Sequence, residues 1–570
     1  MISDTKWERG DYVMKIKHLL VISVILVTSF VMISCNKASD EAETEPATVV
    51  GNSSVKDDEI DLSDITYSND DTDSISKKIF KTMLGDNDSA DEVVYNLTLA
   101  TKIDDYVIRY EVLDNSAVTK KGYLTGKNVE DETVTISASI GKKVRYYKFV
   151  VLGKENAAIK MLDIYGNNLL HNTDDVRDNI TLVDKTGLNN NIAVTWKLKD
   201  DVNADIITMT ATGDNGEIPA GVITRGDVDK KVTLVANASV EIGGELHSKD
   251  FEYELTIKAK PEEKTYEAYI YTYFQGNIYG KGESQHIHLA VSKDGYFWDD
   301  LNDNKPVLKA EKGTKGVRDS FLIRSPYGDK FYLIGTDLDA NGGDWGAYAN
   351  NGSKAIRVWE STDLVNWSEE RLIDIAPKGA GCMWAPECFY DESTGEYVVY
   401  FATGIVGGNG KKIYYVKTRD FYTFTEAKVF KDVEDGITFI DTSITKYNGV
   451  YYRFTKNENE ITILVEKSDK LLGEYSLITT RIANQWGVEG PGIYKINGEE
   501  KWCLYMDGYA NENAGVGYFP LIAESLEDLE KGNFRRLKDG EFKMPDGAKH
   551  GSFVPITMEE YNALVEKWGI

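Results

Sequence analysis

The chain has 570 residues, of which 42% are apolar and 11% aromatic, and its formal net charge is −28. This length predicts several domains rather than a single core, and the composition is that of a folded protein. A chain this acidic would be repelled by a phosphate backbone or an anionic lipid surface, which argues against a nucleic-acid partner.

The first 35 residues have the layout of a secretion signal. From Met14 a short basic stretch leads into an apolar run that ends in small residues and Cys35. A cysteine at this place is typical of a lipoprotein processing site, and a transmembrane anchor is the alternative. We therefore expect a signal peptide over 1–35, a lipid anchor on Cys35, and a location on the cell envelope, at the outer membrane or cell surface.

A polar linker and two β-rich segments follow. Residues 36–80 are acidic and lack hydrophobic periodicity, which predicts a flexible tether. Residues 81–155 and 156–262 contain short alternating strands separated by turn residues, a pattern that predicts two small β-sandwiches. They resemble bacterial immunoglobulin-like modules and contain no catalytic cluster, so we expect spacers or weak sugar-binding units.

A different repeat occupies residues 263–570. A strand ending in Ser or Thr is followed by an acidic residue and then an aromatic one, with five markers about 50–70 residues apart. The markers are Ser292, Ser361, Thr418, Ser468 and Ser525. This pattern predicts an all-β architecture ending in a five-bladed β-propeller. The last strand, near His550, has no marker after it, so we expect it to close the first blade.

Three inner strands of the predicted propeller carry a carboxylate at a similar kink. They are Asp319 in VRDSF, Asp441 in FIDTS and Glu489 in VEGPG. Inner strands face the central channel, and like charges held close together are costly unless they are used. Glycoside hydrolysis requires one protonated carboxyl and one ionised carboxylate on opposite sides of the bond.

These motifs give residues 265–570 a resemblance to glycoside hydrolase family 43. The family's motifs have counterparts in the same order, at Arg318-Asp319-Ser320, Trp384-Ala385-Pro386, Ile440-Asp441-Thr442-Ser443 and Glu489-Gly490-Pro491. The resemblance implies that Asp319 is the general base, Glu489 the general acid, and Asp441 the residue that tunes and holds the acid. It also implies inversion, with base and acid roughly 6.5–9.5 Å apart. Ser320 and Thr442 depart from the family, which usually has proline at both places.

The resemblance also suggests residues around the catalytic acids. It places His550 on the propeller axis as a candidate metal ligand, beside a Ca²⁺ ion, and it requires no other cofactor. Aromatic faces pack on sugar C–H surfaces, so aromatic side chains are candidates for the sugar-facing wall, with filling between blades as the alternative. The substrate-binding candidates are Trp384, Glu387, Trp345 and Trp486.

The sequence as a whole predicts a glycosidase that hydrolyses O-glycosyl bonds in pentose-containing plant cell-wall glycans, such as arabinan or arabinoxylan. An inverting α-L-arabinofuranosidase or arabinan-degrading enzyme is the first hypothesis. A β-xylosidase and a galactan- or galactofuranose-directed hydrolase are alternatives within the same family. A catalytically inactive glycan-binding surface lipoprotein is the alternative from another class.

Overall fold

The computed structural model describes residues 75–113, 116–276, 283–432 and 436–570. The predicted signal peptide, Cys35 and the linker as far as residue 74 lie outside these ranges. All described residues belong to one compact unit. Within the described ranges, no helix is both long and apolar enough to cross a lipid bilayer.

The first module has one main sheet, in the order β3-β4-β5, faced by a helix. Alternate residues of β4, including Val134 and Ile136, point into the core, where they meet Ile79 and Met83 of α1. Because α1 begins before residue 81, the module starts earlier than the sequence predicted. Its elements are α1 (Ile75–Leu84), β1 (Lys102–Ile103), β2 (Tyr106–Val107), β3 (Arg109–Val112), β4 (Glu132–Ile140) and β5 (Lys143–Val151).

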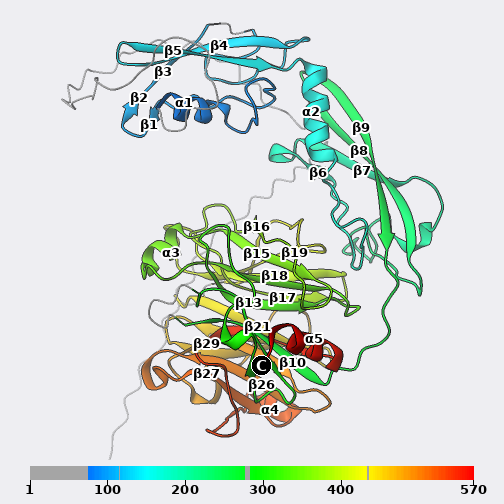
Figure 1. Ribbon diagram of the computed structural model, residues 1–570, viewed down its shortest axis with the longest axis vertical. Coiled ribbons are helices and arrows are strands. Elements are labelled where there is room, and N and C mark those ends of the chain that lie inside the picture. Colours follow the sequence, from blue (N-terminus) through cyan, green and yellow to red (C-terminus); the bar gives the residue numbers. More distant parts are fainter. Residues whose placement is uncertain (1–74, 114–115, 277–282, 433–435) are drawn as a thin grey trace, which may run out of the picture. The chain divides into compact units, whose positions relative to one another are not determined.

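The second module has a four-stranded sheet, β6-β7-β8-β9, with helix α2 lying against β8 and β9 (Figure 1). Gly166 ends α2 where a β-carbon would lie 2.2 Å from the ring of Phe251, so glycine permits the close approach. The predicted boundary at 155–156 falls inside α2, and the immunoglobulin-like assignment of both modules stays a prediction. The elements are α2 (Lys154–Gly166), β6 (Lys185–Thr186), η1 (Leu188–Asn190), β7 (Ile192–Leu198), η2 (Ala204–Ile206), β8 (Lys230–Ile242) and β9 (Glu245–Ile257).

Five four-stranded antiparallel sheets form the rest of the described chain. The first contains β10 (Ala268–Gln275), β11 (His288–Ser292), β12 (Asp299–Asp300) and β29 (Ala548–Ile556), and the second β13 (Val317–Arg324), β14 (Phe331–Asp337), β15 (Ala355–Ser361) and β16 (Arg371–Asp374). The third contains β17 (Trp384–Asp391), β18 (Glu396–Thr403), β19 (Lys412–Thr418) and β20 (Lys428–Lys431). The fourth contains β21 (Phe439–Tyr447), β22 (Val450–Asn457), β23 (Thr462–Ser468) and β24 (Ser476–Thr479), and the fifth β25 (Val488–Lys495), β26 (Trp502–Gly508), β27 (Gly517–Ala523) and β28 (Arg535–Arg536).

The five sheets close into a ring. Strands β29, β13, β17, β21 and β25 contact one another in that order, and β25 returns to β29. The C-terminal strand completes the first sheet by pairing with β10, with Tyr271 opposite Phe553. The predicted five-bladed propeller and its closure are therefore confirmed. Short helices connect or follow the strands of the propeller: α3 (Trp345–Asn351), α4 (Leu526–Lys531), α5 (Met558–Trp568), η3 (Asn302–Asn304), η4 (Ile482–Asn484) and η5 (Asn511–Asn513).

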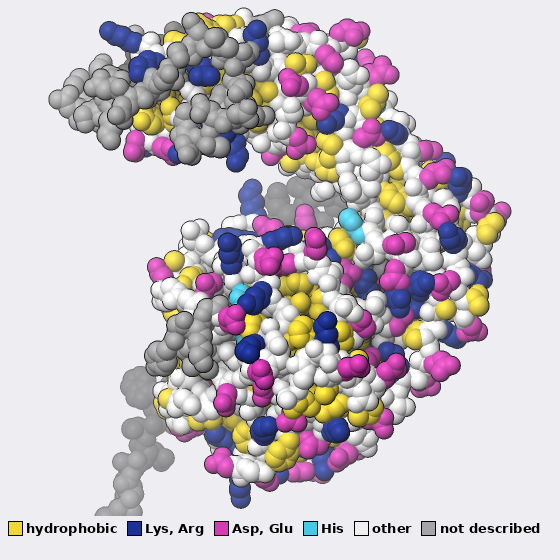
Figure 2. All heavy atoms as spheres, in the orientation of Figure 1, with side chains coloured by type: hydrophobic (Ala, Val, Ile, Leu, Met, Phe, Trp, Pro, Cys, Tyr) yellow, Lys and Arg dark blue, Asp and Glu magenta, His cyan; other side chains and the backbone are white. Residues whose placement is uncertain are grey.

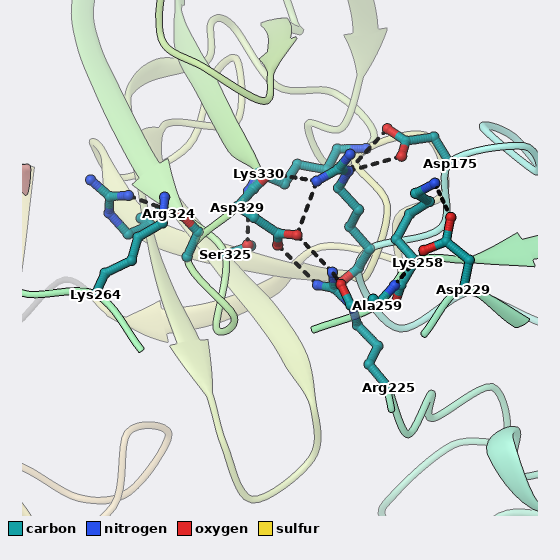
Figure 3. Close-up of polar contacts among 12 residues, drawn as sticks. Asp175, Arg225, Asp229, Lys258, Ala259, Lys264, Arg324, Ser325, Asp329 and Lys330 are labelled. Carbon is teal, nitrogen blue, oxygen red and sulfur yellow. Dashed lines mark hydrogen bonds and ion pairs between the residues drawn. The ribbon is translucent and has the colours of Figure 1, made fainter. Parts of the chain in front are cut away.

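The second module is bonded to the propeller through a buried acidic side chain. Asp329, in the turn between β13 and β14, accepts hydrogen bonds from Arg177 and Arg225 (Figure 3). The shortest contact joins Arg225 Nη2 to Asp329 Oδ2 at 2.6 Å, and the Arg225 side chain has no exposed surface. Nearby, Asp178 of the module accepts a hydrogen bond from the Tyr332 hydroxyl of the propeller at 2.7 Å. These contacts join the module to the propeller, and its role as a spacer or weak sugar-binding unit stays a prediction.

The net negative charge is not gathered into one patch on the face drawn in Figure 2. Acidic and basic side chains are interspersed there. Exposed pairs on the outer surface of β8 and β9, such as Lys231 with Glu254, follow the same pattern. Such exposed pairs contribute little to stability.

Candidate active site

The predicted catalytic motifs coincide with β-bulges in the inner strands. Strand pairing shifts between Arg318 and Phe321 in β13, between Ile440 and Thr442 in β21, and between Glu489 and Gly492 in β25. Asp319 and Asp441 adopt φ angles of 51° and 46°, a left-handed conformation that residues other than glycine seldom adopt. A bulge re-aims the side chain next to it. The fold therefore uses the same local irregularity in three blades to direct carboxylates inward.

All three predicted catalytic carboxylates line one cavity of about 390 Å³. Asp319, Asp441 and Glu489 come from three different blades, as the sequence predicted. Trp345 and Trp384 line the same cavity. A cavity of about 440 Å³ is lined by residues of both N-terminal modules, but the three predicted catalytic acids do not line it, so we place the chemistry in the propeller.

Asp319 is held in its ionised form by donors from two neighbouring strands. Thr336 Oγ1 donates to Asp319 Oδ2 at 3.0 Å, and the same hydroxyl oxygen accepts a hydrogen bond from the Ala385 amide. His550 Nδ1 lies 3.3 Å from Asp319 Oδ1. Burial alone would raise the pKa of Asp319, but the hydrogen bond and charge of His550 prevail, and the pKa is below its usual value. This is the state that a general base requires.

His550 lies between two carboxylates. Its Nδ1 faces Asp319, and its Nε2 lies 3.6 Å from Glu387 Oε1. Burial would lower the pKa of His550, but these two acids raise it well above its usual value, so the ring carries a proton on each nitrogen. Burial also raises the pKa of Glu387 to about 7.

A metal at His550 gains no support from its neighbours. Both ring nitrogens are directed at carboxylates, and no group of three or more His, Cys, Asp or Glu side chains suited to a metal occurs among the residues that the structure describes. The metal role of His550 stays a prediction, and no step proposed below depends on it.

Asp441 contrasts with Asp319 in its protonation. It is 8% exposed, and its Oδ2 accepts a hydrogen bond from the Gly490 amide at 3.0 Å. Burial raises the pKa of Asp441 to about 6, the charges of Glu489 and Asp319 add to this effect, and His550 and Lys456 oppose it. Gly490 itself approaches the axis so closely that a β-carbon there would lie 2.7 Å from His550 Cγ. The Asp441 carboxyl is therefore held against the backbone that carries Glu489.

Glu489 is paired with a lysine that the sequence did not single out. Lys456 Nζ lies 2.8 Å from Glu489 Oε2 and 2.8 Å from Glu458 Oε2. Lys456 lies on β22 opposite Ile440, the residue before Asp441, and it is 2% exposed. The sequence could have indicated this residue, because Lys456 ends an aromatic strand, YYRFTK, and a lysine buried in such a strand usually has a charged partner.

The two departures from proline are compensated by hydroxyl groups. Ser320 Oγ donates to Thr272 Oγ1 at 3.2 Å, and Thr442 Oγ1 is 3.1 Å from Thr455 Oγ1. Ser320 and Thr442 are both buried. Hydrogen bonds to neighbouring strands therefore hold these segments, where the family usually relies on the fixed φ of proline.

Two of the four predicted substrate-binding residues lie in the cavity wall. The rings of Trp345 and Trp384 meet edge to face with centroids 6.2 Å apart. Arg318 lies over the Trp345 ring and Lys411 over the Trp384 ring. Arg318 and Lys411 also line the cavity, and reasoning from the sequence did not assign them a role.

The other two predicted substrate-binding residues lie outside the lining. Glu387 is 3% exposed and faces His550, because it lies beyond the β17 bulge. Trp486 is 41% exposed, but it precedes β25 and is not part of the cavity wall. Neither residue lines this cavity, and their substrate-binding roles stay predictions.

A closed ring of five sheets that brings three carboxylates from separate blades into one cavity is typical of propeller glycoside hydrolases. Residues 264–562 match the family described as "Probable glycosyl hydrolase domain", which is related to glycoside hydrolase family 43. The chain belongs to this family.

Individual known proteins are similar to parts of the chain. An α-L-arabinofuranosidase of Bifidobacterium longum subsp. longum is 33% identical over 372 residues, which are 60% of this chain and 34% of that protein. The chain thus spans about a third of the length of this curated relative.

Solved structures are similar to the chain at lower identity. A family 62 α-L-arabinofuranosidase of Coprinopsis cinerea has a TM-score of 0.31 and 12% identity, over 42% of this chain and 74% of that one. An exo-β-1,3-galactanase of Clostridium thermocellum has a TM-score of 0.32 and 18% identity, over 42% and 51%. Both scores are low, and the fold assignment rests on the sheet order of the chain itself.

Proposed function

We propose that the propeller is an inverting glycoside hydrolase that releases α-L-arabinofuranose from plant cell-wall glycans such as arabinan or arabinoxylan. One observation carries this proposal: three carboxylates from separate blades line one cavity, and the surroundings of Asp319 and Asp441 favour opposite protonation states. Surroundings that separate the protonation of nearby carboxyls are what acid–base catalysis requires.

The reaction would proceed in one displacement. Asp319 takes a proton from water, and the water oxygen forms a bond to the anomeric carbon. The bond from that carbon to the leaving oxygen breaks, and Glu489 gives its proton to the leaving oxygen. Asp441, held on the Gly490 amide, positions the acid and keeps its own proton near neutral pH more readily than an ordinary aspartate.

The choice of sugar rests on the cavity wall and the curated relative. Trp345 and Trp384 offer aromatic faces of the kind that pack on sugar C–H surfaces. The similarity to an α-L-arabinofuranosidase favours arabinofuranose over xylose or galactose. A β-xylosidase and a galactan-directed hydrolase remain the alternatives within the family.

A panel of aryl glycosides tests the proposal. The full chain should release the aryl group from an α-L-arabinofuranoside faster than from a β-xyloside, a β-galactoside or a galactofuranoside. Asp319→Asn and Glu489→Gln should each lower kcat/KM by about 10³-fold or more, because each removes one proton-transfer group. Binding of arabinose without turnover would instead support the inactive glycan-binding alternative. Turnover by either variant at the rate of the wild type would contradict the role assigned to the substituted residue.

We also propose that the enzyme is a lipoprotein of the cell envelope, anchored through Cys35 at the outer membrane or cell surface. The support is the order of a basic stretch, an apolar run and a terminal cysteine in the sequence. Cys35→Ala should abolish incorporation of labelled fatty acid and move the protein from the membrane fraction. Labelling that persists in Cys35→Ala would contradict the anchor.

A further inference from the structure

A single buried ammonium group bridges two carboxylates at the edge of the cavity. Lys456 Nζ is 2.8 Å from Glu489 Oε2 and 2.8 Å from Glu458 Oε2. The Lys456 side chain is 2% exposed, whereas Glu489 and Glu458 are 27% and 32% exposed. All three residues line the cavity. The bridge therefore lies where substrate would meet Glu489.

This arrangement poses a chemical problem for a general acid. The acid must carry a proton when substrate is bound, yet an ammonium in direct contact favours the ionised carboxylate. If Glu489 were the only partner of Lys456, its protonation would leave a buried cation without a counter-charge, which is costly. A second carboxylate on the same ammonium removes this obstacle, and Glu458 supplies it.

The geometry of the bridge also divides the two oxygens of Glu489. Lys456 engages Oε2, and within the described ranges no hydrogen bond engages Oε1. An ammonium has three donors, and the Tyr509 ring lies 4.8 Å from Nζ on a further side. One oxygen of the acid is thus fixed, and the other is left to carry the proton towards the leaving group.

We propose that Lys456 and Glu458 are positioning residues for the acid: Lys456 fixes Glu489 Oε2, and Glu458 keeps the ammonium paired when Glu489 is protonated. This inference rests on the proposed glycosidase function, and it assigns to neither residue a contact with the reacting atoms. The bridge would let a carboxyl beside a lysine carry the proton that a general acid requires.

Other charged groups face the bridge and stay in place in the test. Asp441 and Tyr509 interact with Lys456 from the neighbouring strands, and Asp507, which pairs with Lys549, faces Glu489. Lys411 Nζ is 3.9 Å from Glu458 Oε1. Glu458→Gln therefore leaves Asp441, Asp507 and Tyr509 unchanged, but it removes a carboxylate from Lys411 as well as from Lys456.

The pH dependence of kcat/KM separates a positioning role from a merely structural one. In Glu458→Gln the ammonium rests on Glu489 alone, so the basic limb should move to lower pH by about one unit. In Lys456→Met the basic limb should move to higher pH, with a lower kcat because Oε2 is no longer fixed. Glu460→Gln is the matched control, because it removes an exposed carboxylate from the same loop and should leave the limb in place.

A second readout does not require turnover. Infrared difference titration should show a carboxyl band that is lost in Glu489→Gln and that titrates at lower pH in Glu458→Gln than in the wild type. When Lys456 is already replaced by Met, adding Glu458→Gln should move the titration of this band to lower pH by much less than it does in the wild type.

Each outcome decides one of the two proposals. A basic limb and a band that stay in place in Glu458→Gln would overturn the positioning role, even where kcat falls. If no aryl glycoside is hydrolysed by the wild type, the proposed function fails, while the band titration still supports or overturns the bridge.

Discussion

His550 Nδ1 lies 3.3 Å from Asp319 Oδ1. Strand β29, which closes the first blade, therefore places a histidine beside the predicted base on the neighbouring inner strand β13. The closure of the propeller thus has a chemical consequence as well as a structural one. The imidazolium lowers the pKa of Asp319 against the effect of burial, and this makes the base dependent on strand β29.

His550→Gln should therefore shift the acidic limb of kcat/KM to higher pH. Without the positive charge the pKa of Asp319 rises, so a higher pH is needed before the base is ionised, and we expect a shift of about one unit or more. The measurement is a full pH profile with an aryl glycoside. Thr336→Val, which removes one neutral donor to Asp319, should move the limb in the same direction by a smaller amount. An unmoved limb in His550→Gln would show that the imidazole does not set the base.

Asp441→Asn should stabilise the fold at neutral pH while it damages catalysis. The pKa of Asp441 is raised from 3.8 to about 6, so the folded state binds an extra proton between these values, and stability falls as the pH rises through this window. Above pH 6 the ionised carboxyl costs on the order of 2–3 kcal/mol, which asparagine does not incur.

Denaturant unfolding at pH 4 and pH 8 checks this sign. The variant and the wild type should be nearly equally stable at pH 4, where the carboxyl is neutral, and the variant should be more stable at pH 8. If the variant and the wild type are equally stable at both pH values, the folded state does not raise the pKa of Asp441.

The sequence predicted the propeller because its signals are local and repeated. Each blade repeats a Ser or Thr marker, and in the structure Ser292 and Ser361 accept hydrogen bonds from backbone amides in the turns that follow them. The three carboxylates were found in the same way, through short motifs at bulges. Asp319 and Asp441 occupy the left-handed position of their bulges, whereas Glu489 lies one residue earlier in its own.

The missed residues depend on contacts between blades, which no local pattern encodes. Lys456 belongs to β22, yet its partner Glu489 lies on β25 of the next sheet. Glu387 was placed on the sugar-facing wall from its motif alone, but the β17 bulge turns it towards His550. The predicted bounds of the modules stay predictions; α2 begins at Lys154, just before the boundary at 155–156, and packs on β8 and β9 of the second module.

Trp384→Ala should raise KM for an aryl arabinofuranoside by about 10-fold, and by more than Trp486→Ala does. Trp384 lines the cavity beside the acids, whereas Trp486 lies outside the lining although the sequence predicted the same role for both. Loss of one stacked aromatic face removes roughly 1–1.5 kcal/mol of binding, which is about tenfold. The comparison is made by steady-state kinetics on both variants. A larger KM increase in Trp486→Ala than in Trp384→Ala would place sugar binding at Trp486 rather than at Trp384.

Asp329→Ala should destabilise the folded chain by about 3–5 kcal/mol. The side chain of Arg225 has no exposed surface, and its guanidinium contacts Asp329 through both Nη atoms, so removal of the carboxylate leaves a buried positive charge. Thermal unfolding of the full chain measures the loss. In the double variant Arg225→Met with Asp329→Ala, part of the stability should return, because no unpaired charge then remains. If the single and double variants unfold alike, the module is held by its apolar contacts and backbone hydrogen bonds, and the buried ion pair is not what joins it to the propeller.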